Sequence, residues 1–125
     1  MTSGVYVITN AVTGDQYVGA SGKVELRART HRTALMRGAH CNKRLQAAWE
    51  QYGAANFTLK LVEPIELIGS DVADQETLKA SEKRWIDDVR PTYNYLRHVQ
   101  RAAEVGLDLW GTQIVETPAL AADTG

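Results

Sequence analysis

The chain has 125 residues, 44% of them hydrophobic and 23% charged, and a net charge of −1, which predicts one ordinary globular domain. No stretch is long and apolar enough to cross a membrane, and the N-terminus lacks the basic and apolar regions of a secretory signal. The single cysteine, Cys41, excludes an internal disulfide and a multi-cysteine zinc site, so we expect a protein of the cytoplasm.

Residues 4–21, GVYVITNAVTGDQYVGAS, predict a β-hairpin, because two runs rich in Val, Ile, Thr and Tyr flank a group of turn-forming residues. With the turn centred between Ala11 and Val12, Tyr6 would lie directly opposite Tyr17. Opposed residues of an antiparallel pair point to the same face. The two phenol groups would then lie side by side, either as an aromatic pair that packs a core or as functional groups.

A helix is predicted over residues 24–37, ended by Gly38. Its Arg27 and His31 are four residues apart and so share one face. Around this helix, residues 23–44 carry seven basic side chains and one acid, whereas residues 54–125 carry seven basic and twelve acidic ones. Such a basic segment is either a face that binds a phosphate backbone or a solvated helix surface. The candidate backbone contacts are Lys23, Arg29, Arg32, Arg37, Lys43 and Arg44.

The element order β-β-α-α-β-α predicts an α+β fold, with a small three-stranded, at least partly antiparallel sheet flanked by helices. Apolar residues recur at helical spacing after Asn42 and with period two from Phe57. In chain order, the elements after the first helix are a helix over 42–52 capped by Asn42, a strand over 56–62 ended by Pro64, a loop over 66–74, a helix over 75–89 and a connector over 92–95.

Glu82 is out of place on the last of these helices. It falls four residues after Leu78 and three before Trp85, inside their apolar stripe. A carboxylate that faces a core is costly unless it is paired or binds a cation. Glu82 therefore either forms a salt bridge to a basic residue of the first helix or holds a divalent metal.

The C-terminal part is expected to differ from the rest. Residues 96–110 predict a helix interrupted at Gly106, and residues 117–125 are small and polar and should fray. We therefore divide the chain into a main domain over 1–97 and a helical extension with a flexible tail over 98–125. The amphipathic pattern of 96–110 favours contact with a partner protein or with a second copy of the chain.

Seven elements now stand in order along the chain. They are Gly4-Val5-Tyr6, Tyr17-Val18-Gly19, Arg27 with His31, Gly38-Ala39-His40, Leu45-Gln46-Ala47-Ala48-Trp49 with Tyr52-Gly53, Glu82 before Trp85-Ile86, and Tyr93-Asn94. Together they resemble the GIY-YIG nuclease family, closest to the catalytic domains of phage homing endonucleases and their freestanding relatives. The resemblance covers residues 3–97.

The resemblance implies hydrolysis of a phosphodiester with one divalent ion, Mg²⁺ or Mn²⁺, held by Glu82, since Mg²⁺ often takes one carboxylate together with substrate phosphate. Arg27 would clamp the phosphate. One tyrosine would activate water and the other orient the phosphate, with Tyr6 preferred as the base. His31 would donate to the phosphate or shuttle a proton, with His40 in support and Asn94 organising the site. The implied catalytic set is Tyr6, Tyr17, Arg27, His31, His40, Glu82 and Asn94.

One departure concerns the residues just before the second tyrosine. Some family members place a lysine there, where it would depress the pKa of a phenol, but this chain has Asp15 and Gln16. That leaves activation of the base to Arg27 and the metal.

Two main functions stay open on these grounds, with a structure-specific repair nuclease as a third and weaker possibility. The first is a freestanding, metal-dependent DNA endonuclease, encoded by a phage or a mobile element, because no helix-turn-helix repeat and no Cys/His zinc pattern follows Asn94. The second is a nuclease-derived DNA-binding module whose activity or targeting depends on a partner protein.

Overall fold

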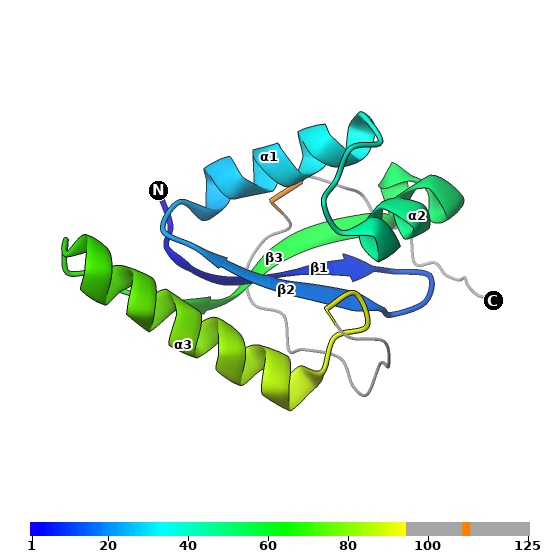
Figure 1. Ribbon diagram of the computed structural model, residues 1–125. Helices are drawn as coiled ribbons and strands as arrows, with labels where there is room; N and C mark the ends of the chain where they lie inside the picture. The colour runs from blue at the N-terminus through cyan, green and yellow to red at the C-terminus, as the bar shows by residue number, and fades with distance from the viewer. Residues whose placement is uncertain (95–108, 111–125) are drawn as a thin grey trace.

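The computed structural model describes residues 1–94 and 109–110. It has the expected α+β fold, a three-stranded sheet in the order β2-β1-β3 whose two strand pairs are both antiparallel (Figure 1). No helix in the described part of the chain has the length and apolar character needed to cross a membrane. The elements are β1 (Gly4–Asn10), β2 (Gln16–Ser21), α1 (Val24–Met36), α2 (Lys43–Tyr52), a short 3-10 helix η1 (Ala54–Asn56), β3 (Phe57–Pro64) and α3 (Asp71–Val89).

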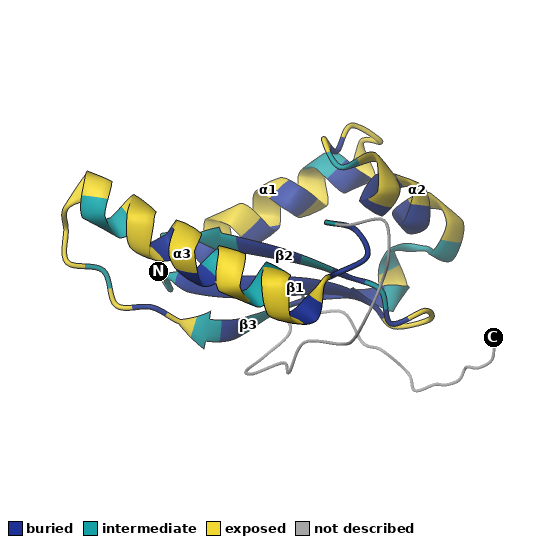
Figure 2. Ribbon diagram, turned by 60° about the horizontal axis from the view of Figure 1, so that its bottom comes forward, coloured by how far each residue is buried: buried dark blue, intermediate teal, exposed yellow. Residues whose placement is uncertain are grey.

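The sheet lies between two helical layers, with α1 and α2 on one face and α3 on the other (Figure 1). Strand β1 is central and every one of its residues is buried, while α1 and α3 turn exposed residues outward (Figure 2). Alternate residues of β1 therefore serve two cores: Tyr6 and Ile8 face α1 and α2, whereas Val5 and Val7 face α3.

A β-bulge in β3 lets that strand contribute to both cores. Val5 pairs with Glu63 and Tyr6 pairs with Leu61, which leaves Val62 as the extra residue. Leu61 consequently packs with the cluster on the α1 side, and Val62 with the cluster under α3.

The predicted hairpin forms, but the predicted register is wrong. Tyr6 pairs with Gly19, and Tyr17 pairs with Ile8. The turn is centred one residue later than expected, because the N–H of Asn10 donates to the Asp15 carbonyl and the N–H of Gly14 donates to the Asn10 carbonyl, at 2.9 and 2.7 Å. Shifting the centre by one residue shifts the pairing by two, so both tyrosines keep the same face.

The helix boundaries agree with the sequence at α1 and α2 and differ at α3. Asn42 caps α2 by accepting from the Leu45 N–H, as expected. The α3 helix begins at Asp71, whereas the sequence predicted a loop there and a start at Gln75. Ser70 caps the helix, and the Asp74 carboxylate accepts from the backbone just before it, so acidic residues stabilise an earlier first turn.

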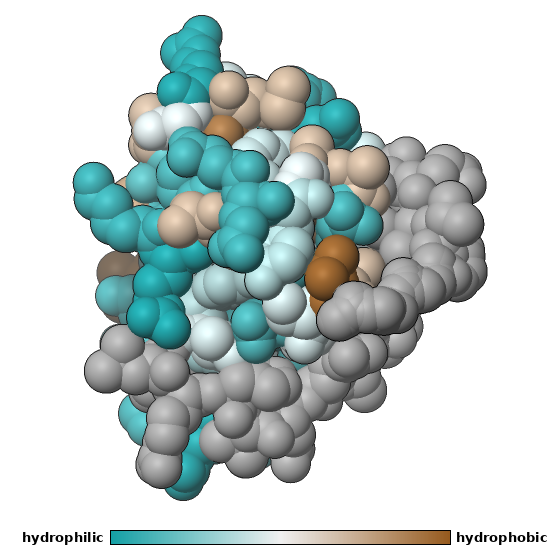
Figure 3. Space-filling model, turned by 90° about the vertical axis from the view of Figure 1, so that its right-hand side faces the viewer, coloured by the Kyte–Doolittle hydropathy of each residue, from teal (hydrophilic) through white to brown (hydrophobic). Residues whose placement is uncertain are grey.

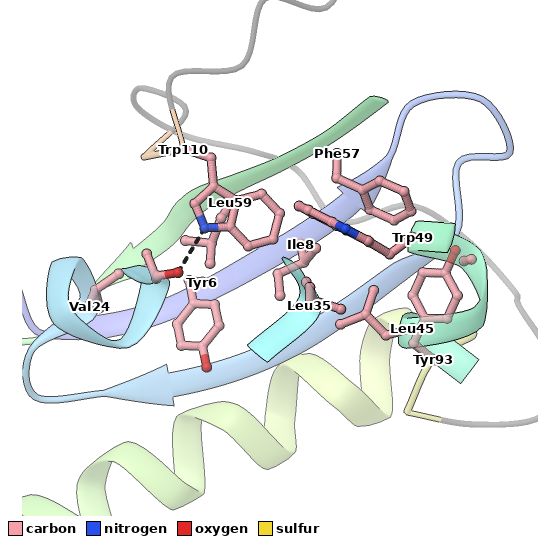
Figure 4. Packing of buried hydrophobic residues seen from close by; sticks show 12 residues of the cluster. Tyr6, Ile8, Val24, Leu35, Leu45, Trp49, Phe57, Leu59, Tyr93 and Trp110 are labelled. Atoms are coloured by element: carbon pink, nitrogen blue, oxygen red, sulfur yellow. Dashed lines mark hydrogen bonds between the residues drawn. The ribbon is translucent and has the colours of Figure 1, made fainter. Parts of the chain in front are cut away.

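Most of the predicted C-terminal helix and tail lies outside the described residues. Leu109 and Trp110 are described, and they pack against the main domain. The Leu109 N–H donates to the Leu59 carbonyl on the edge of β3 that faces away from β1, at 2.7 Å. Buried Trp110 meets Trp49 edge to face, and its Nε1–H donates to the Ala28 carbonyl at 2.8 Å (Figure 4). Leu109 and Trp110 thus contact the main domain of their own chain, and contact of residues 96–110 with a partner stays a prediction.

Candidate active site

Tyr6 lies on β1 with its ring across Gly19 of β2. A Cβ added to Gly19 would be 2.4 Å from both Cζ and the hydroxyl oxygen of Tyr6, so only glycine leaves room for the ring. Tyr6 is 2% exposed, and its hydroxyl points away from the side chains of Leu59 and Trp110 (Figure 4). The glycine that ends the second motif thus makes space for the tyrosine that ends the first.

Two histidines continue from the Tyr6 hydroxyl in a chain of hydrogen bonds. The Tyr6 oxygen lies 2.6 Å from Nε2 of His31, and Nδ1 of His31 lies 2.7 Å from Nε2 of His40. The two imidazoles are stacked with ring centroids 4.9 Å apart. Burial, with Arg27 and His40 nearby, lowers the pKa of His31 to about 3, so His31 is neutral at physiological pH.

Tyr17 completes an aromatic cluster with these groups. Its ring centroid is 5.7 Å from that of His31 and 6.4 Å from that of His40, and both contacts are edge to face. Burial is the largest cause that raises the pKa of Tyr17, and the nearby Cys41 thiol raises it further. The structure therefore brings both tyrosines and both histidines together on the α1 side of the sheet, although the two phenols are not direct cross-strand partners.

Arg27 stands beside the Tyr6 hydroxyl at the solvent side of the cluster. Burial raises the pKa of Tyr6 well above its usual value, and the charge and hydrogen bond of Arg27 oppose that rise. The guanidinium also lines an open depression of about 260 Å³ between the end of β2 and the start of α1, together with Lys23. Arg27 is exposed, so a phosphate in this depression would reach it directly.

Glu82 reaches the site over the edge of β2 that faces away from β1. Its half-buried carboxylate accepts from the Ala20 N–H, and burial raises the pKa of Glu82 against the opposing effects of that bond and of Lys79. The ion pairs found among the described residues do not join Glu82 to a basic residue of α1.

The donor set suits a hard cation that needs few protein ligands. No group of three or more His, Cys, Asp or Glu side chains converges among residues 1–94 and 109–110. Zinc and most calcium sites are built from several protein ligands. Mg²⁺ often takes one carboxylate, several waters and substrate phosphate, and Glu82 offers such a carboxylate. The residues present therefore fit a single Mg²⁺ or Mn²⁺ ion.

Asn94 closes the same strand edge beside Glu82. Its Oδ1 accepts from the Val18 N–H at 2.8 Å, and its Nδ2 donates to the Val18 carbonyl at 3.1 Å. The Tyr93 N–H donates to the Gln16 carbonyl at 3.0 Å, one step along the edge. These bonds fasten the turn at 92–94 to the hairpin.

Asp15 and Gln16, the two residues just before the second tyrosine, have structural roles. The Asp15 carboxylate accepts from the Thr92 hydroxyl at 2.9 Å, and the buried Gln16 amide donates to the Thr9 hydroxyl at 3.2 Å. Both therefore hold the hairpin and the turn at 92–94 in place. Neither offers a positive charge to a phenol.

The basic candidates all lie on the surface. Lys23, Arg29, Arg32, Arg37, Lys43 and Arg44 are exposed. Arg29 and Arg37 line a second open depression of about 360 Å³, which shares Thr30 with the depression at Arg27, so the two adjoin along α1. Arg32 donates to the Trp110 carbonyl at 2.8 Å, which gives it a structural contact. Most of the described surface at the α2 end is hydrophilic to neutral, with small hydrophobic patches (Figure 3).

Sequence reasoning missed Gln46 as a site residue. Gln46 is 8% exposed, and its Oε1 accepts from the His40 N–H at 3.0 Å. The signal was its spacing: Gln46 lies three residues before the core residue Trp49, so it shares the buried face of α2. A polar residue on a buried face needs hydrogen-bond partners, and these are found in the loop that carries His40.

Comparisons with known proteins agree with this geometry. A family model described as the GIY-YIG catalytic domain matches residues 2–94. A mutant of the catalytic domain of intron endonuclease I-TevI is similar in structure, with a TM-score of 0.65, 23% identity, and coverage of 82% of this chain and 100% of that one. The catalytic domain of homing endonuclease I-TevI has a TM-score of 0.59, 26% identity, and coverage of 74% and 94%. A comparison with curated proteins finds no match.

Proposed function

We propose that this chain, which belongs to the GIY-YIG family, is a DNA endonuclease that hydrolyses phosphodiester bonds with the help of Mg²⁺ or Mn²⁺. The observation that carries the proposal is the convergence at one strand edge of a phenol paired to a neutral imidazole, an exposed guanidinium and a half-buried carboxylate. The family membership expected from the motifs is confirmed by the family model.

Hydrolysis requires a water oxygen to attack phosphorus while the bond from phosphorus to the leaving oxygen breaks. Negative charge then builds on the phosphoryl oxygens, and Arg27 is placed to bind it because its planar fork matches phosphate. The attacking water must give up a proton, and we assign its acceptor to the ionised form of Tyr6. Arg27 favours that ionised form against the larger opposing effect of burial, and His31 would favour it as well when it donates to the Tyr6 oxygen. Tyr17 would orient the phosphate.

Glu82 would hold the divalent cation at the edge of β2. When bound, the cation neutralises charge on the phosphate and the leaving oxygen. The positive charge of such an ion would oppose the effect of burial, which raises the pKa of Glu82. A single carboxylate supports one ion, so each active site would cut one strand at a time.

The basic side chains along α1 and at the start of α2 would follow the DNA backbone. The two adjoining depressions place Lys23, Arg29 and Arg37 on the same exposed side of α1 as Arg27. Contacts of this kind bind any sequence and weaken as salt rises. We therefore expect a nuclease of homing or mobile-element type whose contacts along α1 add little sequence specificity.

The test is cleavage of supercoiled plasmid with Mg²⁺ by the purified full chain. The unmutated protein should nick or linearise the plasmid, and EDTA should stop the reaction. Arg27→Ala and Glu82→Ala should each lower the rate about 100-fold or more, as expected when a charge-stabilising group is removed. Glu76→Ala is the matched control, because Glu76 is an exposed carboxylate on the same helix as Glu82.

Two further results complete the test. Arg29→Ala should weaken DNA binding and flatten its dependence on salt, with a small effect on the rate at saturating DNA. Intact plasmid with the unmutated protein, when that protein is folded and still binds DNA, would refute the catalytic proposal. It would favour a DNA-binding module that depends on a partner protein.

A further inference from the structure

The backbone determines which nitrogen of His40 carries the proton. The Asn42 N–H donates to Nδ1 of His40 at 3.0 Å. A backbone N–H is always a donor, so Nδ1 must accept and cannot carry a hydrogen. Burial and the nearby Arg27 lower the pKa of His40, which favours its neutral form. A neutral His40 bonded in this way has its proton on Nε2.

This assignment gives the series of hydrogen bonds from His40 to Tyr6 a single direction. Nε2–H of His40 lies 2.7 Å from Nδ1 of His31, so Nδ1 of His31 accepts. A neutral His31 then has its proton on Nε2, which lies 2.6 Å from the Tyr6 oxygen. His31 is therefore the donor and the Tyr6 oxygen the acceptor. The hydroxyl hydrogen of Tyr6 must point elsewhere, and the guanidinium of Arg27, which has only donors, cannot accept it.

Gln46 holds His40 in the position that the chain requires. Its Oε1 accepts from the His40 N–H, while its Nε2 donates to the Leu35 carbonyl at 3.1 Å and to the Glu50 carboxylate at 3.0 Å. One buried amide thus fastens the loop residue His40 to the end of α1 and to α2. Without it, the side chain of His40 would be held only through its ring, by the Asn42 N–H and by the contact with His31, and its backbone would lose this anchor.

We propose that Gln46 is a positioning residue of the site, which together with the Asn42 N–H holds His40 in one tautomer, so that His40 and His31 form a one-way chain of hydrogen bonds that ends on the Tyr6 oxygen. The effect on reaction rate rests on the proposed nuclease function, whereas the direction of the chain is a property of the protein alone.

The direction of these hydrogen bonds bears on whether His31 acts as a donor or as a proton shuttle, which the sequence left open. For His31 to receive the Tyr6 proton, Nε2 of His31 would have to accept, and every proton along the chain would have to move. Nδ1–H of His40 would then face the Asn42 N–H, with two donors opposed in a buried place. His31 therefore stabilises the ionised Tyr6 oxygen by donating to it, and it does not take up the proton of Tyr6.

The first test measures the tautomers by NMR of the ¹⁵N-labelled full chain at neutral pH. The ring nitrogens of each histidine report which one carries hydrogen. H31Q, H40Q and H98Q spectra assign the signals, since the chain has three histidines. We expect hydrogen on Nε2 and a bare Nδ1 in both His31 and His40. Hydrogen on Nδ1 of either residue would overturn the proposal, whether or not the protein cuts DNA.

The second test compares Q46M with Q51M. Methionine keeps the length of glutamine and removes its hydrogen bonds, and Gln51 is an exposed residue of the same helix. Q46M should lower kcat at least tenfold, leave KM for plasmid DNA within about twofold, and give a mixture of tautomers at His40. Q51M should change none of these values. A single unchanged tautomer in Q46M, with or without a fall in kcat, would contradict the positioning role.

A conservative replacement of His40 gives an independent check. The side-chain amide of H40Q ends in an N–H donor near the position of Nε2, whereas H40A has no donor. H40Q should therefore recover part of the activity that H40A loses, and His31 should keep its proton on Nε2 in H40Q alone. Equal activity and equal His31 spectra in the two variants would overturn the one-way chain.

Discussion

The contact between Gly19 and Tyr6 predicts that adding one methyl group will damage both stability and activity. In Gly19→Ala the new Cβ would lie 2.4 Å from Cζ and from the hydroxyl oxygen of Tyr6, whereas ordinary contacts begin at 3.4 Å. The ring must therefore retreat by about 1 Å. Gly19 is not among the glycines with positive φ, so the effect comes from space and not from backbone strain.

The expected cost follows from two terms. Overpacking of this kind costs about 1–3 kcal/mol. Retreat by about 1 Å would also stretch the 2.6 Å contact between Tyr6 and His31 beyond hydrogen-bond distance, at about 1 kcal/mol. Gly19→Ala should therefore lower the free energy of unfolding in urea by about 2–4 kcal/mol. It should lower the cleavage rate about 100-fold, because a displacement of 1 Å is costly at a reacting group.

Two comparisons make this prediction refutable. Gly22→Ala is the control, because a Cβ there would meet only the Leu67 side chain at 3.4 Å. In a Tyr6→Ala background the new Cβ has no ring to clash with, so Gly19→Ala should then lower the free energy of unfolding by less than about 0.5 kcal/mol. An equal cost of Gly19→Ala with and without the Tyr6 ring would show that the steric reasoning is wrong.

Three further predictions follow from other contacts. Trp110→Ala should lower the free energy of unfolding by about 3–5 kcal/mol, because removal of a buried indole leaves a cavity, and Trp110→Phe should lower it less. Urea titration measures both variants, and an alanine variant with unchanged stability would show that Trp110 is not part of the core. Asn94→Asp should cost about 1–3 kcal/mol and speed hydrogen exchange at Val18, since a carboxylate cannot donate to the Val18 carbonyl. The pKa of His31 is about 3 in the folded state and about 6.5 unfolded, so its contribution to stability is complete above pH 6.5 and falls as pH drops. Between pH 6.5 and 5 the loss is about 2 kcal/mol, and a His31→Gln variant whose stability falls as steeply would contradict this assignment.

The faces of the elements were predictable, because periodicity alone determines them. Tyr6 and Tyr17 were expected on one face, and they share it even though the register was wrong by two residues. The centre of the turn was harder to predict. It is set by hydrogen bonds of Asn10 and Gly14, and the composition of the turn does not show which of several possible hydrogen bonds will form. The early start of α3 had a local signal in Ser70, which the sequence reading passed over.

The hydrogen-bond chain was not predictable from spacing. His40 lies in a loop, where no periodicity says which way a side chain points. Its position depends on Gln46 from a neighbouring helix and on the N–H of Asn42, which are contacts between elements. The bulge at Val62 is a similar case, because it is defined only relative to the partner strand. The sequence therefore identified which chemical groups meet, while tertiary contacts decide how they are joined.

The closed edge of β2 has a consequence for the solubility of the protein. A bare edge strand is a template to which another chain can add a strand. Here the side chains of Glu82 and Asn94 occupy the outward backbone groups of Ala20 and Val18. Glu82 and Asn94, which we propose as site residues, thus also prevent another chain from pairing with this edge. Alanine at either position would expose part of that template, so we expect such a variant to be more prone to aggregate.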